Sequence, residues 1–391
     1  MKKITLIFLS FSLFSFGMSY ENFKKHTLKH AKTLQRQVLL LEQTKIQNNI
    51  ALRTLNPTLG VEVGRFEPEF TDASYGYSIS ATQTIRTQGY MDALQSNTLS
   101  QTELSKAQIK NARATYIKTL EDLYTDYVYQ SKLLGILQEE HRLSSKMVNT
   151  VKERYQNGSE SKVAYLQAKT QTLALKTQIH STKKQKQTLY YQLLAMGGFS
   201  KKISLSKKFI YPVPGKYKQS KKQSAKEKIL LAKHRLFASQ LRMKENRFES
   251  YNITAGIEKE PEQSILRLGI SLTLPLRHNK EEEKALARIK MQTAELDRGQ
   301  LHLDIRSKKQ MYRSALKELS SQYHALTLLK KEQLSLTNLL QEGYTIAQGR
   351  LLELMIAKNA LIQTKKSLLL SQKELNLTRI SLRLLQGHYD D

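Results

Sequence analysis

The sequence repeats itself once, and this duplication limits the possible folds more than any other feature. Residues of the first half recur in the second half in the same order and at one offset: Tyr155 with Tyr344, Ala168 with Ala357, and Lys169 with Lys358. The triplet Glu-Pro-Glu also occurs twice, at 67–69 and 260–262. Matches that keep their order over half a chain indicate two copies of one large unit, not a solenoid of many short repeats.

Each copy contains two runs in which apolar and polar residues alternate, which predicts a β-hairpin at 57–85 and another at 250–276. Each run has about ten residues, the length that a tilted strand needs to cross a bilayer. One face is aliphatic and tyrosine-rich and the other is small and polar, which favours lipid on one side and water on the other. A soluble hairpin with one face on a core is the alternative. Because membrane barrels need about eight strands, four strands imply an oligomer.

Helical patterns fill most of the remaining sequence. Residues 89–196 and 280–386 contain no proline and are predicted to form two long helical hairpins. Their apolar residues recur at spacings of three and four: Leu120, Leu123, Tyr127, Leu134 and Leu137 in one, and Leu316, Leu319, Tyr323, Leu326 and Leu329 in the other. A continuous helix of roughly 65 residues measures about 100 Å. The narrow apolar stripe is typical of helices that pack against other helices, as in coiled coils.

The N-terminal residues 1–19 are predicted to be a secretory signal peptide. Lys2 and Lys3 precede an apolar stretch, and Gly17 and Ser19 supply small residues for cleavage before Tyr20. The rest divides into a first repeat at 20–197, a basic connector at 198–221 and a second repeat at 222–391. Each repeat begins with a helix, which in the first repeat is predicted to run from Tyr20 to Leu52. No other segment has about 20 consecutive apolar residues, so no transmembrane helix is expected.

The chain is strongly basic, with a formal net charge of +29. Such a charge suggests nucleic acid or an anionic membrane as a partner. Nucleic acid is disfavoured as a partner because the basic residues are spread along most of the chain and because a signal peptide directs the protein out of the cytoplasm. The absence of cysteine excludes disulfides, thiolate metal sites and a lipid-modified N-terminal cysteine.

Three local motifs resemble the TolC family of outer-membrane efflux proteins. The first is Arg154-Tyr155-x-x-Gly158-x-x-Ser161, which is similar to the helical turn at that family's periplasmic tip. The others are Leu-Leu-Glu-Leu at 351–354 and Leu-Thr-Leu-Pro-Leu at 272–276. The resemblance implies a mainly helical fold with a small transmembrane β part, in which a homotrimer forms one β-barrel in the outer membrane and one periplasmic helical tunnel.

The same resemblance implies the function and its partners. The trimer would be the exit duct of a tripartite efflux or type I secretion system, served by a periplasmic adaptor and an inner-membrane pump. The implied adaptor contacts are the residues of the two tip turns: Arg154, Tyr155, Gly158, Ser161, Tyr344, Gly349 and Arg350. The implied pore constriction is Glu353, although the family's next acidic position is occupied here by Ile356. A ring of carboxylates would attract cations, whereas a surface Glu at a helix start is the alternative.

No catalytic set, phosphate-binding loop or metal motif accompanies these features, so no enzyme activity, cofactor or metal is expected. Gln83-Thr84-Ile85 resembles the strand exit of the family's heavy-metal branch, and His26 and His30 have helical spacing but lack a third ligand. Two other readings stay open: a periplasmic adaptor, and a basic coiled-coil scaffold. The sequence identifies neither the transported substrate nor the partner pump.

Overall fold

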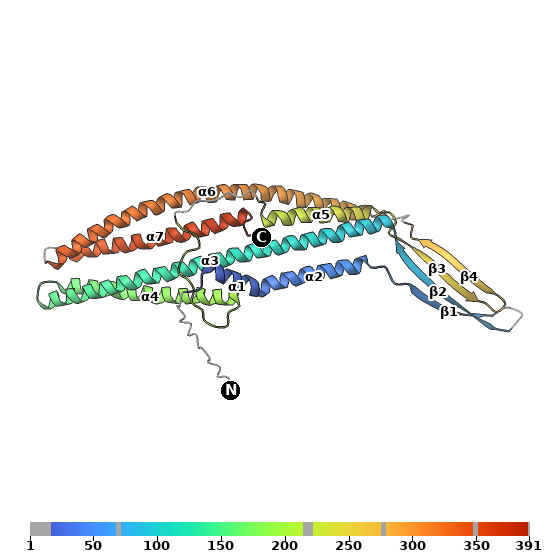
Figure 1. Cartoon of the computed structure of the whole chain (residues 1–391), viewed down its shortest axis with the longest axis horizontal. Coiled ribbons are helices and arrows are strands. Elements are labelled where there is room, and N and C mark those ends of the chain that lie inside the picture. Colours follow the sequence, from blue (N-terminus) through green and yellow to red (C-terminus); the bar gives the residue numbers. More distant parts are fainter. Residues whose placement is uncertain (1–16, 68–71, 214–221, 275–278, 347–350, 390–391) are drawn as a thin grey trace, which may run out of the picture. The chain divides into compact units, whose positions relative to one another are not determined.

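A computed structural model describes residues 17–67, 72–213, 222–274, 279–346 and 351–389. The chain divides into two compact units. We call them the helical unit (1–34, 113–222 and 306–389) and the sheet unit (35–112 and 223–305). Both units draw on both sequence repeats, so neither unit corresponds to one repeat. Figure 1 labels the helices and strands along the chain.

The sheet unit contains one antiparallel four-stranded sheet, in the order β1-β2-β3-β4. The strands are β1 (Thr58–Phe66), β2 (Ser74–Arg86), β3 (Ser250–Lys259) and β4 (Ser264–Leu272). Each repeat contributes one hairpin, and β2 pairs with β3 to join them. Strands β1 and β4 are the edges, and each has a strand on one side only.

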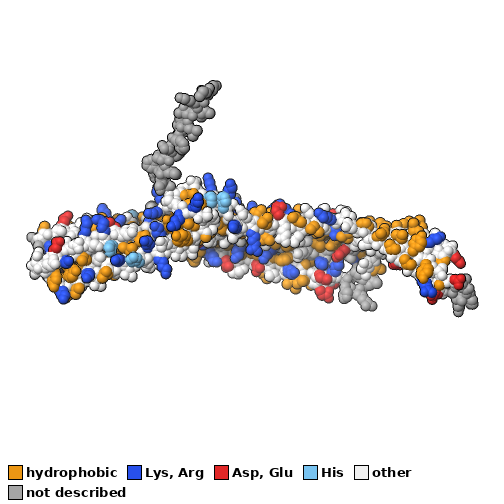
Figure 2. Space-filling model, turned by 90° about the horizontal axis from the view of Figure 1, so that it is seen from below, with side chains coloured by type: hydrophobic (Ala, Val, Ile, Leu, Met, Phe, Trp, Pro, Cys, Tyr) orange, Lys and Arg blue, Asp and Glu red, His pale blue; other side chains and the backbone are white. Residues whose placement is uncertain are grey.

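The register of the sheet places apolar side chains together on one face. Val61 lies opposite Ile79, Ile79 opposite Ile257, and Ile257 opposite Leu266. The next row contains Leu59, Ala81, Ala255 and Leu268. Residues directly opposite each other share a face, so these rows form one continuous apolar face. This face is exposed; Leu268 and Ile270 each retain 77% of their accessible surface. It forms the apolar patch at the right of Figure 2.

The opposite face of the sheet is small and polar. Thr82 and Thr254 share a hydrogen bond of 3.0 Å between their hydroxyls, and the Thr84 hydroxyl donates to the side-chain Oδ1 of Asn252 at 2.8 Å. Asn252 in turn donates to Ser271 at 3.3 Å. One face of this sheet therefore favours apolar surroundings, and the other favours water.

Two helices and the first parts of two longer helices also belong to the sheet unit. They are α2 (Lys32–Leu52), α5 (Ala225–Glu245) and the first parts of α3 (Gln88–Gln156) and α6 (Glu281–Thr345). Small residues let these helices approach: Ala93, Ala107, Ala232, Ala287 and Ala294 are all buried. Buried amides join them, since Asn48 of α2 donates to the Thr98 carbonyl of α3 at 2.8 Å. The Ser239 hydroxyl of α5 donates to Asn97 of α3 at 3.3 Å.

The helical unit contains α1 (Tyr20–His30), α4 (Lys162–Gly197), α7 (Leu351–Leu385) and the second parts of α3 and α6. Its core packs α1 against α3, α4 and residues of the connector. Phe23, Leu120, Tyr124 and Leu193 are completely buried there. The N-terminal segment is thus an integral part of this unit.

The first predicted helix differs from the structure in one respect. The sequence predicts a single helix from Tyr20 to Leu52, but α1 ends at His30 and α2 begins at Lys32. Ala31 adopts an extended conformation and is buried. The break falls where the helical pattern is uninterrupted in sequence, so no helix-breaking residue accounts for it.

Candidate functional site at the paired helical turns

The first helical turn, between α3 and α4, is defined by two residues of the predicted motif. Gly158 has a φ of +75°, in the left-handed region that residues with a Cβ rarely adopt. The Ser159 amide donates to the Arg154 carbonyl at 2.8 Å, which closes the end of α3. Ser161 then caps α4, because its hydroxyl accepts from the Ala164 amide at 3.1 Å. The predicted turn residues therefore reverse the chain between two long helices.

Arg154 connects this turn to the second one. Its guanidinium donates to the Tyr344 carbonyl at 2.6 Å and lies 4.1 Å from the centre of the Tyr344 ring. The Tyr344 hydroxyl donates to Glu160 at 3.4 Å. Burial raises the pKa of Tyr344, with Arg154 lowering it and Glu160 raising it further. One arginine of the first repeat thus binds an end carbonyl of α6 in the second repeat.

An apolar cluster lies behind these polar contacts and involves both helical hairpins. Its buried members are Val151, Ala168, Tyr344, Leu351 and Leu354. These residues belong to α3, α4, α6 and α7, so the two turns are packed together as one structural element. Gly349 and Arg350, which the resemblance also assigned to the tip, lie outside the described residues.

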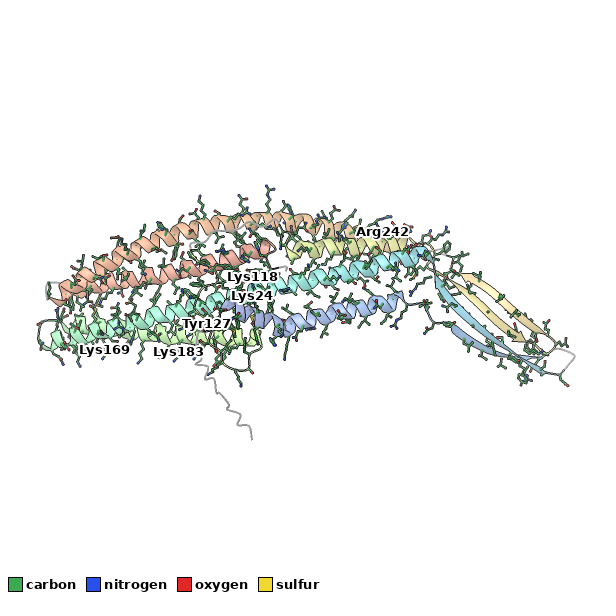
Figure 3. The ribbon with its side chains drawn as sticks, in the orientation of Figure 1. Lys24, Lys118, Tyr127, Lys169, Lys183 and Arg242 are labelled. Carbon is green, nitrogen blue, oxygen red and sulfur yellow. The ribbon has the colours of Figure 1, made fainter. Side chains whose placement is uncertain are left out.

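Equivalent positions of the two repeats have different surroundings. Tyr344 is buried, whereas its counterpart Tyr155 is exposed and stacks on Tyr165 with the rings 6.0 Å apart. Lys358 donates to Gln341 at 2.6 Å, and burial lowers the pKa of its ammonium group. Its counterpart Lys169 is exposed on α4 (Figure 3). The duplicated sequence therefore forms an asymmetric site.

Glu353 lies in the first turn of α7 and is exposed. Exposed apolar side chains flank it, with Leu352 and Ile356 on the same side of the helix start. Leu354 instead points into the apolar cluster. The carboxylate is therefore accessible, as a pore-lining group must be, and it also lies where a helix start favours negative charge.

A line of ion pairs continues the contact between α3 and α7. Lys365 binds Glu140 at 2.7 Å, and Lys373 binds Asp126 at 2.7 Å. Lys366 of α7 donates to Gln178 of α4 at 3.0 Å. Sequence reasoning missed these pairs, because the partners come from different repeats.

A buried cluster around Glu121 was also missed. Glu121 of α3 retains 1% of its side-chain surface. It accepts hydrogen bonds from Tyr20 at 2.9 Å, from Tyr211 at 2.9 Å and from Tyr389. Lys24 lies 3.4 Å from the same carboxylate. We call these five residues the Glu121 cluster; they join α1, α3, the connector and the segment after α7. The sequence signal that could have indicated this cluster is an acidic residue, Glu121, directly after Leu120 of the apolar stripe.

Burial raises the pKa values of Tyr20, Tyr211 and Tyr389, and the nearby Glu121 raises them further. The three hydroxyls thus remain protonated and act as donors. Burial also raises the pKa of the neighbouring Tyr124 to about 12, and its hydroxyl donates to the Ser206 carbonyl at 2.8 Å.

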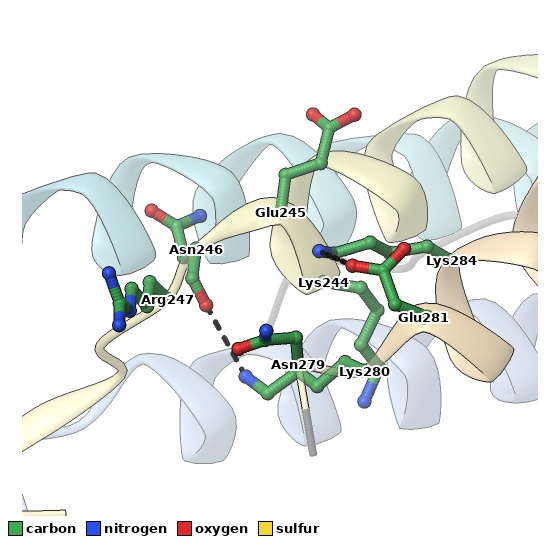
Figure 4. Close-up of a pocket in the computed structure, with 8 residues that line it drawn as sticks. All are labelled: Lys244, Glu245, Asn246, Arg247, Asn279, Lys280, Glu281 and Lys284. Carbon is green, nitrogen blue, oxygen red and sulfur yellow. Dashed lines mark hydrogen bonds and ion pairs between the residues drawn. The ribbon is translucent and has the colours of Figure 1, made fainter. Parts of the chain in front are cut away.

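Charged residues also meet where α5 leads into β3 and where α6 begins. A hollow of about 360 Å³ is lined by Lys244, Glu245, Asn246, Arg247, Asn279, Lys280, Glu281 and Lys284 (Figure 4). Lys280 has a φ of 59° and reaches Asn246 and Glu249, and Lys284 binds Glu281 at 3.0 Å. The Lys280 contacts connect the start of α6 to the segment between α5 and β3, whereas the pair of Lys284 and Glu281 lies within α6. In the first hairpin, Gln83 donates to the Leu55 carbonyl at 2.8 Å.

His26 and His30 stack with their ring centres 4.1 Å apart, and His26 also stacks on Phe199. Burial lowers the pKa of His26, and His30 lowers it further. Within the described ranges, no group of three His, Cys, Asp or Glu side chains could hold a metal ion. None of the helices in the part of the chain that the structure describes is long and apolar enough to cross a membrane.

Comparison with known proteins adds a family match and a fold match. Residues 25–198 match the model of the outer membrane efflux protein family. No curated protein sequence matches the chain. The outer membrane protein VceC of Vibrio cholerae is 14% identical with a TM-score of 0.78, covering 94% of this chain and 95% of VceC.

Two further solved structures agree. The CmeC outer membrane channel of Campylobacter jejuni is 15% identical with a TM-score of 0.80, covering 94% of this chain and 86% of CmeC. The MtrE outer membrane channel of Neisseria gonorrhoeae is 14% identical with a TM-score of 0.75, covering 94% of this chain and 88% of MtrE. Identities this low show a shared fold, and they confirm the predicted fold class.

Proposed function

Because residues 25–198 match the outer membrane efflux protein family, as the sequence motifs predicted, we propose that this protein is the outer-membrane exit duct of an efflux or secretion system. In this proposal it has no enzymatic role. It resides in the outer membrane, and its helical unit extends into the periplasm. Substrates pass through it from an inner-membrane pump and a periplasmic adaptor to the exterior.

The exposed apolar face of the sheet is the observation that carries this proposal. Four adjacent strands present Val61, Ile79, Ile257 and Leu266 in one row, without a protein layer over them in the described structure. A continuous apolar surface of this kind calls for a partner that is not water. Lipid on this face and water on the polar face satisfy both sides of the sheet.

The open edges of the sheet support a homotrimer. Strand β4 of one copy would pair with β1 of the next, which is a head-to-tail contact that closes into a ring. Three copies supply about twelve strands, enough for a barrel, whereas four are too few. Closure would also satisfy the unpaired backbone groups of both edges.

We propose that the paired turns are where the duct meets its adaptor and that Glu353 lines the pore near them. The tie between Arg154 and Tyr344, together with the shared apolar cluster, supports a preformed contact surface. The accessible position of Glu353 in the first turn of α7 is compatible with a ring of three carboxylates.

Cell fractionation followed by sizing with light scattering tests the proposed assembly. A trimer-sized particle extracted by detergent from the outer-membrane fraction is expected. A soluble periplasmic monomer or dimer would refute the duct and favour an adaptor or a scaffold.

Conductance in planar bilayers tests the role of Glu353. Glu353→Ala is expected to weaken block by divalent cations, since three carboxylates leave the pore. Glu342→Ala, which removes an exposed carboxylate at the end of α6, serves as the control. Unchanged cation block in the Glu353 variant would remove it from the pore.

A further inference from the structure

We infer that the precursor is cut between Gly17 and Met18, two residues before the bond that the signal-peptide pattern first suggests. Small residues at the third and first positions before the bond are the sequence requirement. Ser15 and Gly17 meet it for the Gly17–Met18 bond, and Gly17 and Ser19 meet it for the Ser19–Tyr20 bond. The sequence therefore allows both bonds, and the structure distinguishes between them.

Met18 is built into the helical unit through its backbone. Its amide donates to the Ser204 carbonyl at 2.7 Å, and its carbonyl accepts from the Ser206 amide at 3.1 Å. These bonds form a parallel bridge between Met18 and Leu205. The Met18 side chain packs against the buried core that includes Phe23 and Leu120. Cleavage after Ser19 would remove all of these contacts.

Ser19 has an equally specific role as the N-cap of α1. Its hydroxyl accepts from the Asn22 amide at 3.3 Å, and its carbonyl accepts from the Phe23 amide at 3.0 Å. An N-cap satisfies amides that have no partner within the helix. Without Ser19, α1 would begin with exposed amides and no cap.

The charge of the new N-terminus favours the same bond. A chain that begins at Tyr20 places an ammonium group on the first residue of α1, where the helix dipole disfavours positive charge. A chain that begins at Met18 places the ammonium group where the Met18 nitrogen donates to the Ser204 carbonyl. A hydrogen bond from a charged donor is stronger than one from a neutral amide.

The reaction is hydrolysis of one peptide bond. Water adds across the bond between Gly17 and Met18, which leaves a carboxylate on Gly17 of the released peptide and an ammonium group on Met18. The peptidase acts on the chain during export, before the Met18 bridge has formed. The folded contacts therefore neither protect the bond nor direct the peptidase; they show that the product beginning at Met18 is the one that keeps all of these interactions.

The mature N-terminus is measured directly. The full-length chain is produced in a Gram-negative host, and the membrane-extracted protein is examined by intact mass and N-terminal sequencing. A chain beginning at Met18 is expected, heavier by one Met and one Ser residue than a chain beginning at Tyr20. A mature protein beginning at Tyr20 would overturn the inference.

A matched pair of variants assigns the bond by its sequence requirement. Ser15→Leu removes a small residue needed only at the Gly17–Met18 bond, and precursor is expected to accumulate. Ser19→Leu removes one needed only at the Ser19–Tyr20 bond, and normal processing is expected. The reverse pattern would overturn the inference.

Hydrogen exchange tests whether residues 18 and 19 contribute to the folded structure of the mature protein. Two mature forms, beginning at Met18 and at Tyr20, are exported behind the same foreign signal peptide. The amides of Asn22, Phe23 and Ser206 are expected to exchange faster in the shorter form, because each loses its acceptor. Equal exchange in the two forms would show that residues 18 and 19 do not contribute to the fold and would overturn the argument. Neither this result nor the cleavage site depends on whether the duct conducts.

Discussion

The apolar face of the sheet and the Glu121 cluster differ in where their interaction partners come from. In the cluster, three tyrosines and a lysine of the same chain surround one buried carboxylate. On the sheet, the largest apolar side chains remain exposed and two strand edges remain open. The Glu121 cluster therefore completes its polar contacts within the chain, whereas in the proposed duct the sheet obtains its partners from lipid and from further copies.

Burial and exposure therefore have different free-energy costs in the two regions. A polar group buried without partners costs about 1–3 kcal/mol, so the cluster must be satisfied by the fold itself. Apolar surface left in water costs roughly 25 cal/mol per Å², so the sheet is stable in isolation only to a limited degree. Substitutions in the two regions should consequently fail at different stages, one at membrane assembly and the other at folding of the protomer.

The largest effect is expected for a charge on the apolar face. Leu268→Arg places a cation toward lipid, at a cost of about 2–4 kcal/mol per copy near the bilayer centre. We expect the trimer to disappear from the outer-membrane fraction. The control is Gly269→Arg, which lies on the opposite face with open space around it. Equal assembly of both variants would contradict the assignment of lipid to this face.

Removal of the Glu121 carboxylate should destabilise the helical unit next most strongly. Glu121→Ala leaves three buried hydroxyls and Lys24 without their acceptor, which corresponds to about 3–5 kcal/mol. Thermal unfolding and hydrogen exchange in α1 measure the loss. Glu103→Ala, which breaks an exposed pair with Arg235, is the control and should cost roughly 0–1 kcal/mol. A similar loss in both variants would contradict the importance of burial.

Alkaline pH should act on the same region. The pKa of Tyr124 is raised from 10.0 to about 12 in the folded protein, so the unfolded chain releases this proton first. Stability is therefore fully present below pH 10 and falls as the pH rises toward 12, by on the order of 3 kcal/mol from this residue. Alkaline unfolding monitored by tyrosinate absorbance measures it. Tyr124→Phe should unfold less steeply with pH, and an unchanged slope would exclude Tyr124.

The smallest effect is expected at the paired turns. Arg154→Ala removes the hydrogen bond to the Tyr344 carbonyl and the contact with its ring, for a loss of about 1–3 kcal/mol. Hydrogen exchange at residues 340–346 should rise while exchange in the sheet stays constant. Lys152→Ala, an exposed neighbour on α3, is the control. A uniform rise across the chain would mean that Arg154 supports the whole protomer and not the turns.

The strands and long helices could be predicted because their patterns are local. Alternation over about ten residues predicted all four strands, and uninterrupted apolar stripes predicted the helical hairpins. Gly158 and Ser161 were predicted as turn residues, and their conformation and capping agree with that role. The break at Ala31 was missed, since nothing in the neighbouring sequence marks it.

The contacts between distant residues could not be predicted. The residues bonded to Glu121 lie near the N-terminus, in the connector and after α7, and no sequence period relates them. Tyr155 and Tyr344 occupy matching positions in the duplication, but only Tyr344 is buried. A repeat in sequence preserves local structure, whereas neighbours from the rest of the chain differ between its copies.

The kinds of element, their order and the apolar and polar faces of the strands could be predicted from the sequence, because each depends on residues close together in the chain. The pairing of β2 with β3, which joins the two hairpins into one sheet, is seen only in the folded protein. The same is true of the bond from Arg154 to the end of α6 and of the bridge between Met18 and the connector. These contacts form between segments far apart in the chain, so their energies depend on the folded geometry and leave no local pattern in the sequence.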